Sequence, residues 1–187
     1  MGIRNRIDEQ IVERAAWLER PNPAVRGVRA ALNRVLSYDR TLDLAEEMED
    51  WSGPDIMNRM GKMLAQDVEI SGLDRIPRQG GALIVCNHPT GIADGIILWH
   101  LLSPLRPDLF FYANSDMLRV VPQLDCMIAP VEWREDKRNH SKTRETMAYT
   151  RQAMSDGRLG IIFPSGRLAK RRGLRLVERP WMTSAAM

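Results

Sequence analysis

The first third of the chain places apolar residues at every third or fourth position, the spacing that forms one face of a helix. Three segments follow this pattern, at residues 7–18, 25–36 and 56–64. Pro21 and Pro23 interrupt the pattern between the first two segments, and Pro54 suits the first turn of the third. We therefore expect a helical N-terminal region over residues 1–66.

The third helical segment is rich in methionine, with Met57, Met60 and Met63 on its apolar side. Methionine adapts to irregular apolar shapes. This stripe is therefore interpreted either as internal packing or as a surface that contacts an acyl chain or a bilayer.

Beyond residue 67 the pattern changes to short apolar runs that alternate with helical segments. Val68 and Ile70 alternate with polar residues and predict a short strand that ends before Gly72. Further strands are predicted at residues 82–86, 109–113, 127–131 and 159–163, and helices at 93–102, 115–121 and 141–155. Continuous apolar strands between helices are typical of a sheet buried on both faces. We expect an α/β fold over residues 67–187, with a mixed, largely parallel sheet flanked by helices.

The composition is that of a soluble or peripheral globular protein. The chain has 187 residues, enough for one substantial core, and 44% of them are hydrophobic against 27% charged. It contains no run of 18 apolar residues, so a membrane-spanning helix is not expected. Two cysteines, Cys86 and Cys126, favour reduced thiols in a cytoplasmic setting, and no Cys/His spacing resembles a zinc site.

Positive charge is concentrated at the C-terminal end. Residues 167–187 hold six basic residues against the single acid Glu178, a local charge of +5 in a chain whose net charge is +3. Such a cluster attracts the phosphate of a lipid headgroup, a carrier or a nucleic acid, although a solvated basic face is an equally simple interpretation. Nucleic-acid binding is disfavoured, because Trp181 is the one aromatic residue in the cluster and no groove-reading motif occurs.

The candidate chemistry lies where the strand at residues 82–86 ends. Asn87 and His88 follow this strand directly, and Asp94 comes six residues after His88, at the entry to the next helix. A histidine is the best general base at neutral pH, and a carboxylate that fixes its tautomer improves it. No Gly-x-Ser-x-Gly nucleophile motif occurs, so the pair is expected to activate a substrate hydroxyl. The alternative is that Asp94 only caps the helix and His88 is an ordinary loop residue.

A second polar turn follows the strand at residues 159–163. Gly166 and Arg167 in this turn could bind an anion through the guanidinium group and free backbone N–H groups. In open α/β sheets, ligands bind beyond the carboxyl ends of strands, so His88, Asp94 and Arg167 could converge on one pocket. Cys86 is a weaker nucleophile candidate, because an apolar strand raises the pKa of a thiol.

Three blocks of the sequence together resemble the glycerolipid acyltransferase superfamily, which includes bacterial 1-acyl-glycerol-3-phosphate acyltransferases. They lie at residues 68–77, 81–88 and 161–167. The resemblance implies that His88 deprotonates the hydroxyl of a lysolipid acceptor and that Asp94 supports it. The alkoxide would attack the thioester of acyl-CoA or acyl-carrier protein, with no cofactor and no covalent acyl-enzyme. Asn87, Ser165, Gly166 and Arg167 would bind the substrate.

The chain departs from the common family pattern at several positions. Five residues separate His88 from Asp94 where four are usual, a spacing that looks like the haemolysin-like and ornithine-lipid branch. Ser165 replaces a glutamate and Arg167 lies one position early, which weakens the inference that lysophosphatidic acid is the acceptor. Arg134 is a weak candidate for a further acceptor-binding residue.

The resemblance implies an acyltransferase that is peripheral at the cytoplasmic face of the cell membrane. Two alternatives remain open: a thioester or ester hydrolase in which His88 activates water, and a non-catalytic domain that binds acyl carriers or lipid. Because family domains usually continue beyond the second turn, the domain at residues 67–187 is expected to be incomplete at its C-terminus. The acceptor, acyl length, donor and oligomeric state are not predicted.

Overall fold

The computed structural model describes residues 2–132 and 139–181. The chain divides into two compact units, one formed by residues 1–52 with 116–123 and the other by residues 53–115 with 124–187. Within the described ranges, every helix is too short or too polar to cross a bilayer.

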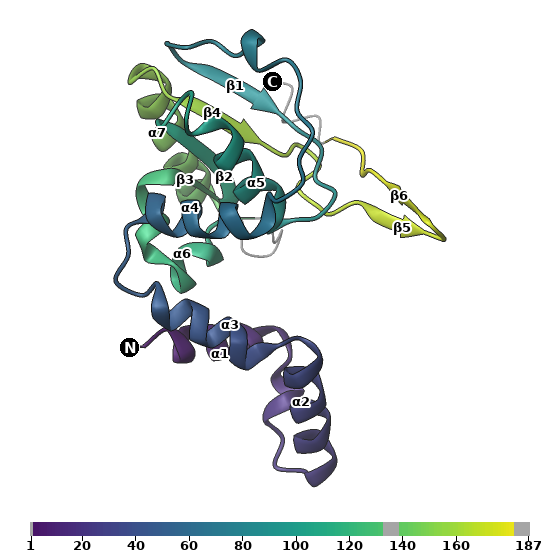
Figure 1. The fold of residues 1–187 in the computed structure, drawn as a ribbon. Helices are drawn as coiled ribbons and strands as arrows, with labels where there is room; N and C mark the ends of the chain where they lie inside the picture. The colour runs from purple at the N-terminus through teal and green to yellow at the C-terminus, as the bar shows by residue number, and fades with distance from the viewer. Residues whose placement is uncertain (1, 133–138, 182–187) are drawn as a thin grey trace. The chain divides into compact units, whose positions relative to one another are not determined.

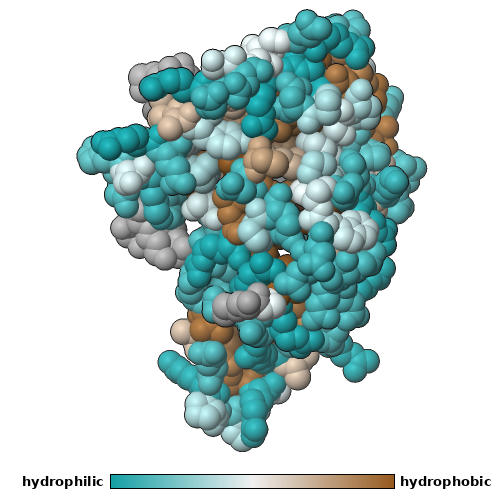
Figure 2. All heavy atoms as spheres, turned by 90° about the vertical axis from the view of Figure 1, so that its left-hand side faces the viewer, coloured by the Kyte–Doolittle hydropathy of each residue, from teal (hydrophilic) through white to brown (hydrophobic). Residues whose placement is uncertain are grey.

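The first unit is helical. Its elements are α1 (Ile3–Arg14), η1 (Ala16–Glu19), α2 (Pro23–Val35), α3 (Tyr38–Glu47) and α6 (Asp116–Val120). The Asn22 side chain accepts a hydrogen bond from the backbone of Ala24 and caps α2, which begins at Pro23, the second proline of the pair. Helix α3 is not evident from the apolar pattern, because only Leu42 among its residues is buried. Several apolar residues of α2 are exposed, and Figure 2 shows hydrophobic area on this N-terminal part.

The second unit confirms the predicted α/β fold. Four parallel strands form a sheet in the order β1–β4–β2–β3, with β1 (Ala82–Val85), β2 (Leu109–Asn114), β3 (Ile128–Val131) and β4 (Leu159–Ile162). The helices are α4 (Gly53–Leu64), α5 (Ile92–Leu102) and α7 (His140–Ser155), with short turns η2 (Leu73–Arg75) and η3 (Pro122–Met127). A separate antiparallel hairpin contains β5 (Lys170–Arg172) and β6 (Arg175–Val177). These four sheet strands and helices α5, α6 and α7 agree with the sequence predictions to within one residue at each end.

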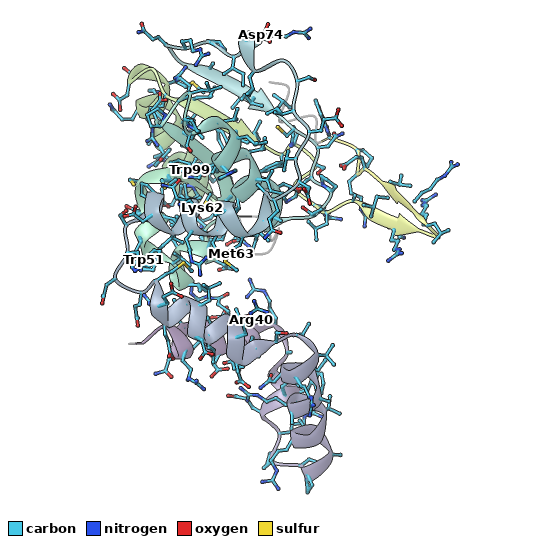
Figure 3. All side chains as sticks on the ribbon, viewed as in Figure 1. Arg40, Trp51, Lys62, Met63, Asp74 and Trp99 are labelled. Atoms are coloured by element: carbon cyan, nitrogen blue, oxygen red, sulfur yellow. The ribbon has the colours of Figure 1, made fainter. Side chains whose placement is uncertain are left out.

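Helices pack against both faces of the sheet (Figure 1). On one face, Phe110 and Ala129 form a buried cluster with Ala153 of α7. On the other face, Phe111 lies against α5 at Gly95, and α5 packs in turn against α4. Trp99 of α5, which is labelled in Figure 3, donates a hydrogen bond to Asn58 of α4, with a donor–acceptor distance of 2.8 Å.

The methionine-rich stripe contributes to this packing. Ile56 and Met57 of α4 are buried, as is Gly61, where an added Cβ would lie 2.8 Å from the Cβ of His100. The internal-packing interpretation therefore holds for this part of the stripe.

The strand predicted at Val68–Ile70 is wrong. The structure has no strand there, and the two side chains are 39% and 43% exposed. Alternating apolar positions form a strand only where a neighbouring edge offers hydrogen bonds. Strand β1 pairs with β4 alone, and residues 68–70 do not pair with its free edge.

A buried arginine joins the loops at the amino ends of the strands. Arg106 is 3% exposed, and its Nε and Nη2 atoms donate hydrogen bonds to both carboxylate oxygens of Asp108, at 2.8 and 2.7 Å. It also donates to the backbone carbonyls of Pro77, Gly80 and Gly157, at 2.8, 3.1 and 2.7 Å. The hydrogen bonds from Arg106 to the Asp108 carboxylate lower the pKa of that carboxyl below its usual value. One side chain thus holds the loop before β1 against the loop before β4.

Replacement of Arg106 by methionine is expected to lower the free energy of unfolding by about 3 kcal/mol, because three carbonyls and a carboxylate lose their partner. We take the lower end of the range for buried pairs, since the Asp108 side chain is 35% exposed. Urea denaturation measures the change.

The matched control is Arg144→Met, an exposed position on α7 that should change the free energy by less than about 0.5 kcal/mol.

The pKa of Asp108 is lowered in the folded state, so the pair stabilises the protein above about pH 4 and this contribution is lost as the pH falls through the lowered pKa. The difference between parent and Arg106→Met should therefore shrink in acid. A constant difference across this range would contradict the assignment.

Candidate active site

The loop that carries His88 is fixed at both ends by backbone geometry. The backbone N–H of Cys86 donates to the carbonyl of Ile162, at 3.0 Å, and so extends the pairing of β1 with β4 by one residue. At the other end, Gly91 precedes α5 with a φ of +94°, a conformation that side chains rarely adopt. An added Cβ at Gly91 would also lie 2.9 Å from the side chain of Leu168. His88 is therefore held at the carboxyl end of β1.

The structure brings the His88 ring and the Asp94 carboxylate together. The Nδ1 atom lies 3.0 Å from Oδ2, and the two side chains are 20% and 12% exposed. Nδ1 is buried and makes no hydrogen bond with acceptable angles among the described residues, but at this distance a small ring rotation would align it with the carboxylate. The same ring stacks on Phe163, with centroids 4.4 Å apart and an interplanar angle of 27°.

The Asp94 carboxylate also holds the loop. Its Oδ2 atom accepts hydrogen bonds from the backbone N–H groups of Thr90 and Gly91, at 3.0 and 2.9 Å, and Oδ1 accepts one from the Thr90 hydroxyl at 2.5 Å. Asp94 is the third residue of α5, where a carboxylate caps the helix in this way. One carboxylate thus caps the helix and lies beside the imidazole, so the two interpretations of Asp94 are compatible.

The second turn meets the first at the same end of the sheet. Strands β1 and β4 are parallel neighbours, so the residues after each strand lie side by side. Phe163 reaches His88 directly, whereas Ser165 is 5% exposed and its hydroxyl donates to the Arg167 carbonyl at 2.9 Å. Gly166 adopts a φ of +56° in this turn. The Ser165 hydroxyl is therefore engaged within the turn, while the side chain of Arg167 is exposed.

The segment after this turn returns across the His88 loop. The backbone N–H of Ala169 donates to the His88 carbonyl at 3.1 Å, and the backbone N–H of His88 donates to Glu178 Oε2 at 3.4 Å. Sequence reasoning missed both Glu178 and Thr90. Thr90 had a usable signal, a hydroxyl four residues before an acid at a helix start. Glu178 had none beyond being the one acid in a basic stretch.

The remaining candidates are Asn87, Cys86 and Arg134. Asn87 is exposed beside His88. Arg134 lies outside the described residues. Cys86 is half-buried, and burial, followed by the negative charge of Asp94, raises the pKa of its thiol. This agrees with the expectation that an apolar strand makes Cys86 a poor nucleophile.

Alkylation of Cys86 by iodoacetamide is expected to be slow at neutral pH and to increase only above the pH at which an ordinary thiol ionises, because only the thiolate reacts. Mass spectrometry of the Cys126→Ser variant across a pH series measures this rate. Cys126 is exposed, so the Cys86→Ser variant supplies the comparison within the same protein. Alkylation of Cys86 at neutral pH as fast as that of free cysteine would show that the thiol is activated.

Two curated proteins are similar to most of this chain. A lyso-glycine lipid O-acyltransferase of Phocaeicola vulgatus is 24% identical over 156 residues, which are 83% of this chain and 54% of that protein. A lyso-glycine lipid O-acyltransferase of Bacteroides thetaiotaomicron is 21% identical over 150 residues, which are 80% and 53% of the two chains. The chain spans about half the length of these relatives. No solved structure matches it.

A family model described as Acyltransferase matches residues 67–187. This range contains the whole parallel sheet, both turns and the His88–Asp94 pair. The confirmed fold and the three sequence blocks agree with that match, and the chain belongs to the Acyltransferase family.

Proposed function

We propose that this protein transfers a fatty acyl group from an acyl thioester to the hydroxyl of a lysolipid-like acceptor, with His88 as the general base. The observation that carries the proposal is the 3.0 Å approach of His88 Nδ1 to the Asp94 carboxylate at the carboxyl end of β1. A carboxylate at Nδ1 favours the tautomer with its proton on that atom, which leaves the Nε2 lone pair for a substrate. General-base assistance of this kind contributes about 10²–10⁴-fold in rate.

The chemical step would proceed without a covalent acyl-enzyme. The acceptor hydroxyl gives its proton to Nε2 of His88 while its oxygen attacks the thioester carbonyl carbon. The new carbon–oxygen bond forms, the carbon–sulfur bond breaks, and the imidazolium returns the proton to the departing thiolate. Asp94 stabilises the imidazolium between these two transfers. The raised pKa of the Cys86 thiol argues against a competing acyl-cysteine route.

The second turn supports this chemistry in two ways. The Phe163 ring lies flat against the imidazole and limits its rotation, which keeps Nε2 directed to one region. We propose that Arg167 pairs with an anionic group of the acceptor, with Asn87 and Gly166 beside it, because all three follow the adjoining ends of β1 and β4. Ser165 would act through its hydrogen bond to the Arg167 carbonyl, not by direct contact with the substrate.

The proposed acceptor is a lyso-lipid with an amino-acid headgroup. Both curated relatives carry the name lyso-glycine lipid O-acyltransferase. The serine at position 165 and the longer His88–Asp94 spacing also depart from the pattern of lysophosphatidic acid enzymes. The donor is either acyl-CoA or acyl-carrier protein. Because such acceptors reside in a bilayer, we propose that the protein is peripheral at the cytoplasmic face of the cell membrane.

Replacement of His88 by alanine is expected to lower acyl transfer by about 10²–10⁴-fold, because the variant lacks the imidazole that lies beside the Asp94 carboxylate. The assay follows transfer from acyl-CoA and from acyl-carrier protein to lyso-glycine lipid and to lysophosphatidic acid, with the first acceptor preferred. The matched control is His140→Ala, an exposed histidine at the start of α7, which should retain parental rates.

Unchanged transfer by His88→Ala would end this mechanism. Release of free fatty acid without acylated acceptor, lost in the same variant, would favour a hydrolase in which His88 activates water. No turnover by the parent, with acyl carriers or lipid still bound, would favour the non-catalytic alternative.

Replacement of Asp94 by asparagine separates its two roles. Asparagine keeps one oxygen for the backbone N–H groups of Thr90 and Gly91, so the free energy of unfolding should fall by no more than about 1 kcal/mol. Loss of the negative charge beside Nδ1 should lower transfer by at least about 10²-fold. Acyl-transfer kinetics and urea denaturation measure the two effects.

The control variant is Thr90→Val, which removes one hydrogen bond to the carboxylate but keeps its charge, and which should lower transfer far less. A loss of stability in Asp94→Asn with near-parental transfer would show that Asp94 only caps α5.

A further inference from the structure

The hairpin β5–β6 has no core of its own. All eight residues from Lys170 to Val177 are exposed, and the hairpin extends away from the four-stranded sheet (Figure 1). Gly173, with a φ of +61°, is the first residue of its two-residue turn, a position where hairpins favour glycine. An isolated two-stranded hairpin is marginally stable in water, so this one gains from a partner that covers its side chains.

The charges of the hairpin favour an anionic partner. Arg172 lies directly opposite Arg175, and Lys170 is on the same face two residues away. Like charges opposite each other destabilise a hairpin, and no carboxylate forms an ion pair with these three side chains in the part of the chain that the structure describes. Anions placed between the three cations would remove this repulsion.

The tip of the hairpin is apolar. Leu174 lies in the turn between Arg172 and Arg175 and is 95% exposed. Leu176 of β6 is 60% exposed. A single exposed leucine is ordinary, but a leucine at the end of a cationic projection is the arrangement of segments that enter a bilayer interface. In such segments, the arginines contact lipid phosphates while the apolar side chain leaves water. A flat anionic protein surface would satisfy the arginines and leave Leu174 in water.

We infer that the β5–β6 hairpin is the docking surface for an anionic bilayer, with Leu174 inserted at the interface and Arg172 and Arg175 paired with lipid phosphates. The base of the hairpin is joined to the candidate active site, because Ala169 donates to the His88 carbonyl and Glu178 accepts from the His88 backbone. Five extended residues from Ala169 to Leu174 span about 16 Å. Docking would keep His88 within that reach of the lipid surface, a consequence that rests on the proposed acyl transfer.

The test is flotation of the full chain with vesicles of phosphatidylcholine alone and of phosphatidylcholine mixed with phosphatidylglycerol. The parent should bind the anionic vesicles, and binding should weaken with salt. Arg172→Glu/Arg175→Glu should weaken binding by at least roughly thirtyfold, the loss expected for two surface arginines. Leu174→Asn should weaken it by roughly tenfold through the lost apolar burial.

The matched control is Arg144→Glu/Arg151→Glu on the exposed side of α7, with the same change in net charge and an expected affinity near that of the parent. Equal losses in the two double variants, or parental binding by the hairpin variant, would overturn the inference. Loss of acyl-carrier protein binding by the hairpin variant, with vesicle binding retained, would also overturn it.

Vesicle binding requires no turnover, so a failure of the proposed acyl transfer would leave this result intact. Transfer to a detergent-solubilised acceptor by the hairpin variant should match that of the parent.

Discussion

The Asp94 carboxylate is the group on which the arrangement of the candidate site depends. It accepts hydrogen bonds from two consecutive backbone N–H groups and from the Thr90 hydroxyl, and it lies 3.0 Å from the His88 ring. The first turn of a helix leaves N–H groups without internal partners, and a carboxylate is the favoured acceptor there. The helix start therefore supplies the means of holding a negative charge at 12% exposure beside the imidazole. Capping of α5 and placement of a carboxylate beside His88 are two results of one set of contacts.

Sequence patterns predicted those parts of the fold in which a segment carries its own signal. Continuous apolar runs located both β4, which lies between two strands, and β1, which lies at the edge of the sheet, and the polar residues after them marked the site. The wrong strand at Val68–Ile70 shows the limit of this reasoning, since alternation specifies a face but not a neighbouring strand. Arg106 was missed for a similar reason. Its partners are mainly backbone carbonyls of distant loops, which no side-chain pattern reveals.

The basic stretch near the C-terminus was recognised by its charge but not by its shape. A three-residue strand of Lys170, Arg171 and Arg172 has neither apolar alternation nor β-branched residues, so nothing in it predicts a hairpin. Ser165 illustrates the opposite case, in which the residue was selected by its alignment with a family motif. Its hydroxyl proves to be buried within the turn, a fact that only the path of the chain after β4 determines.

The contacts between the hairpin and the His88 loop involve backbone atoms of His88. Ala169 donates to its carbonyl, and Glu178 accepts from its N–H, so neither contact depends on the imidazole. The ring stacks on Phe163, and its Nδ1 atom lies 3.0 Å from the Asp94 carboxylate. Side-chain replacement at position 88 therefore removes the proposed base and leaves the connection to the hairpin in place. The proposed chemistry and the proposed membrane docking would share one loop but use different atoms of it, so substitutions can separate the two.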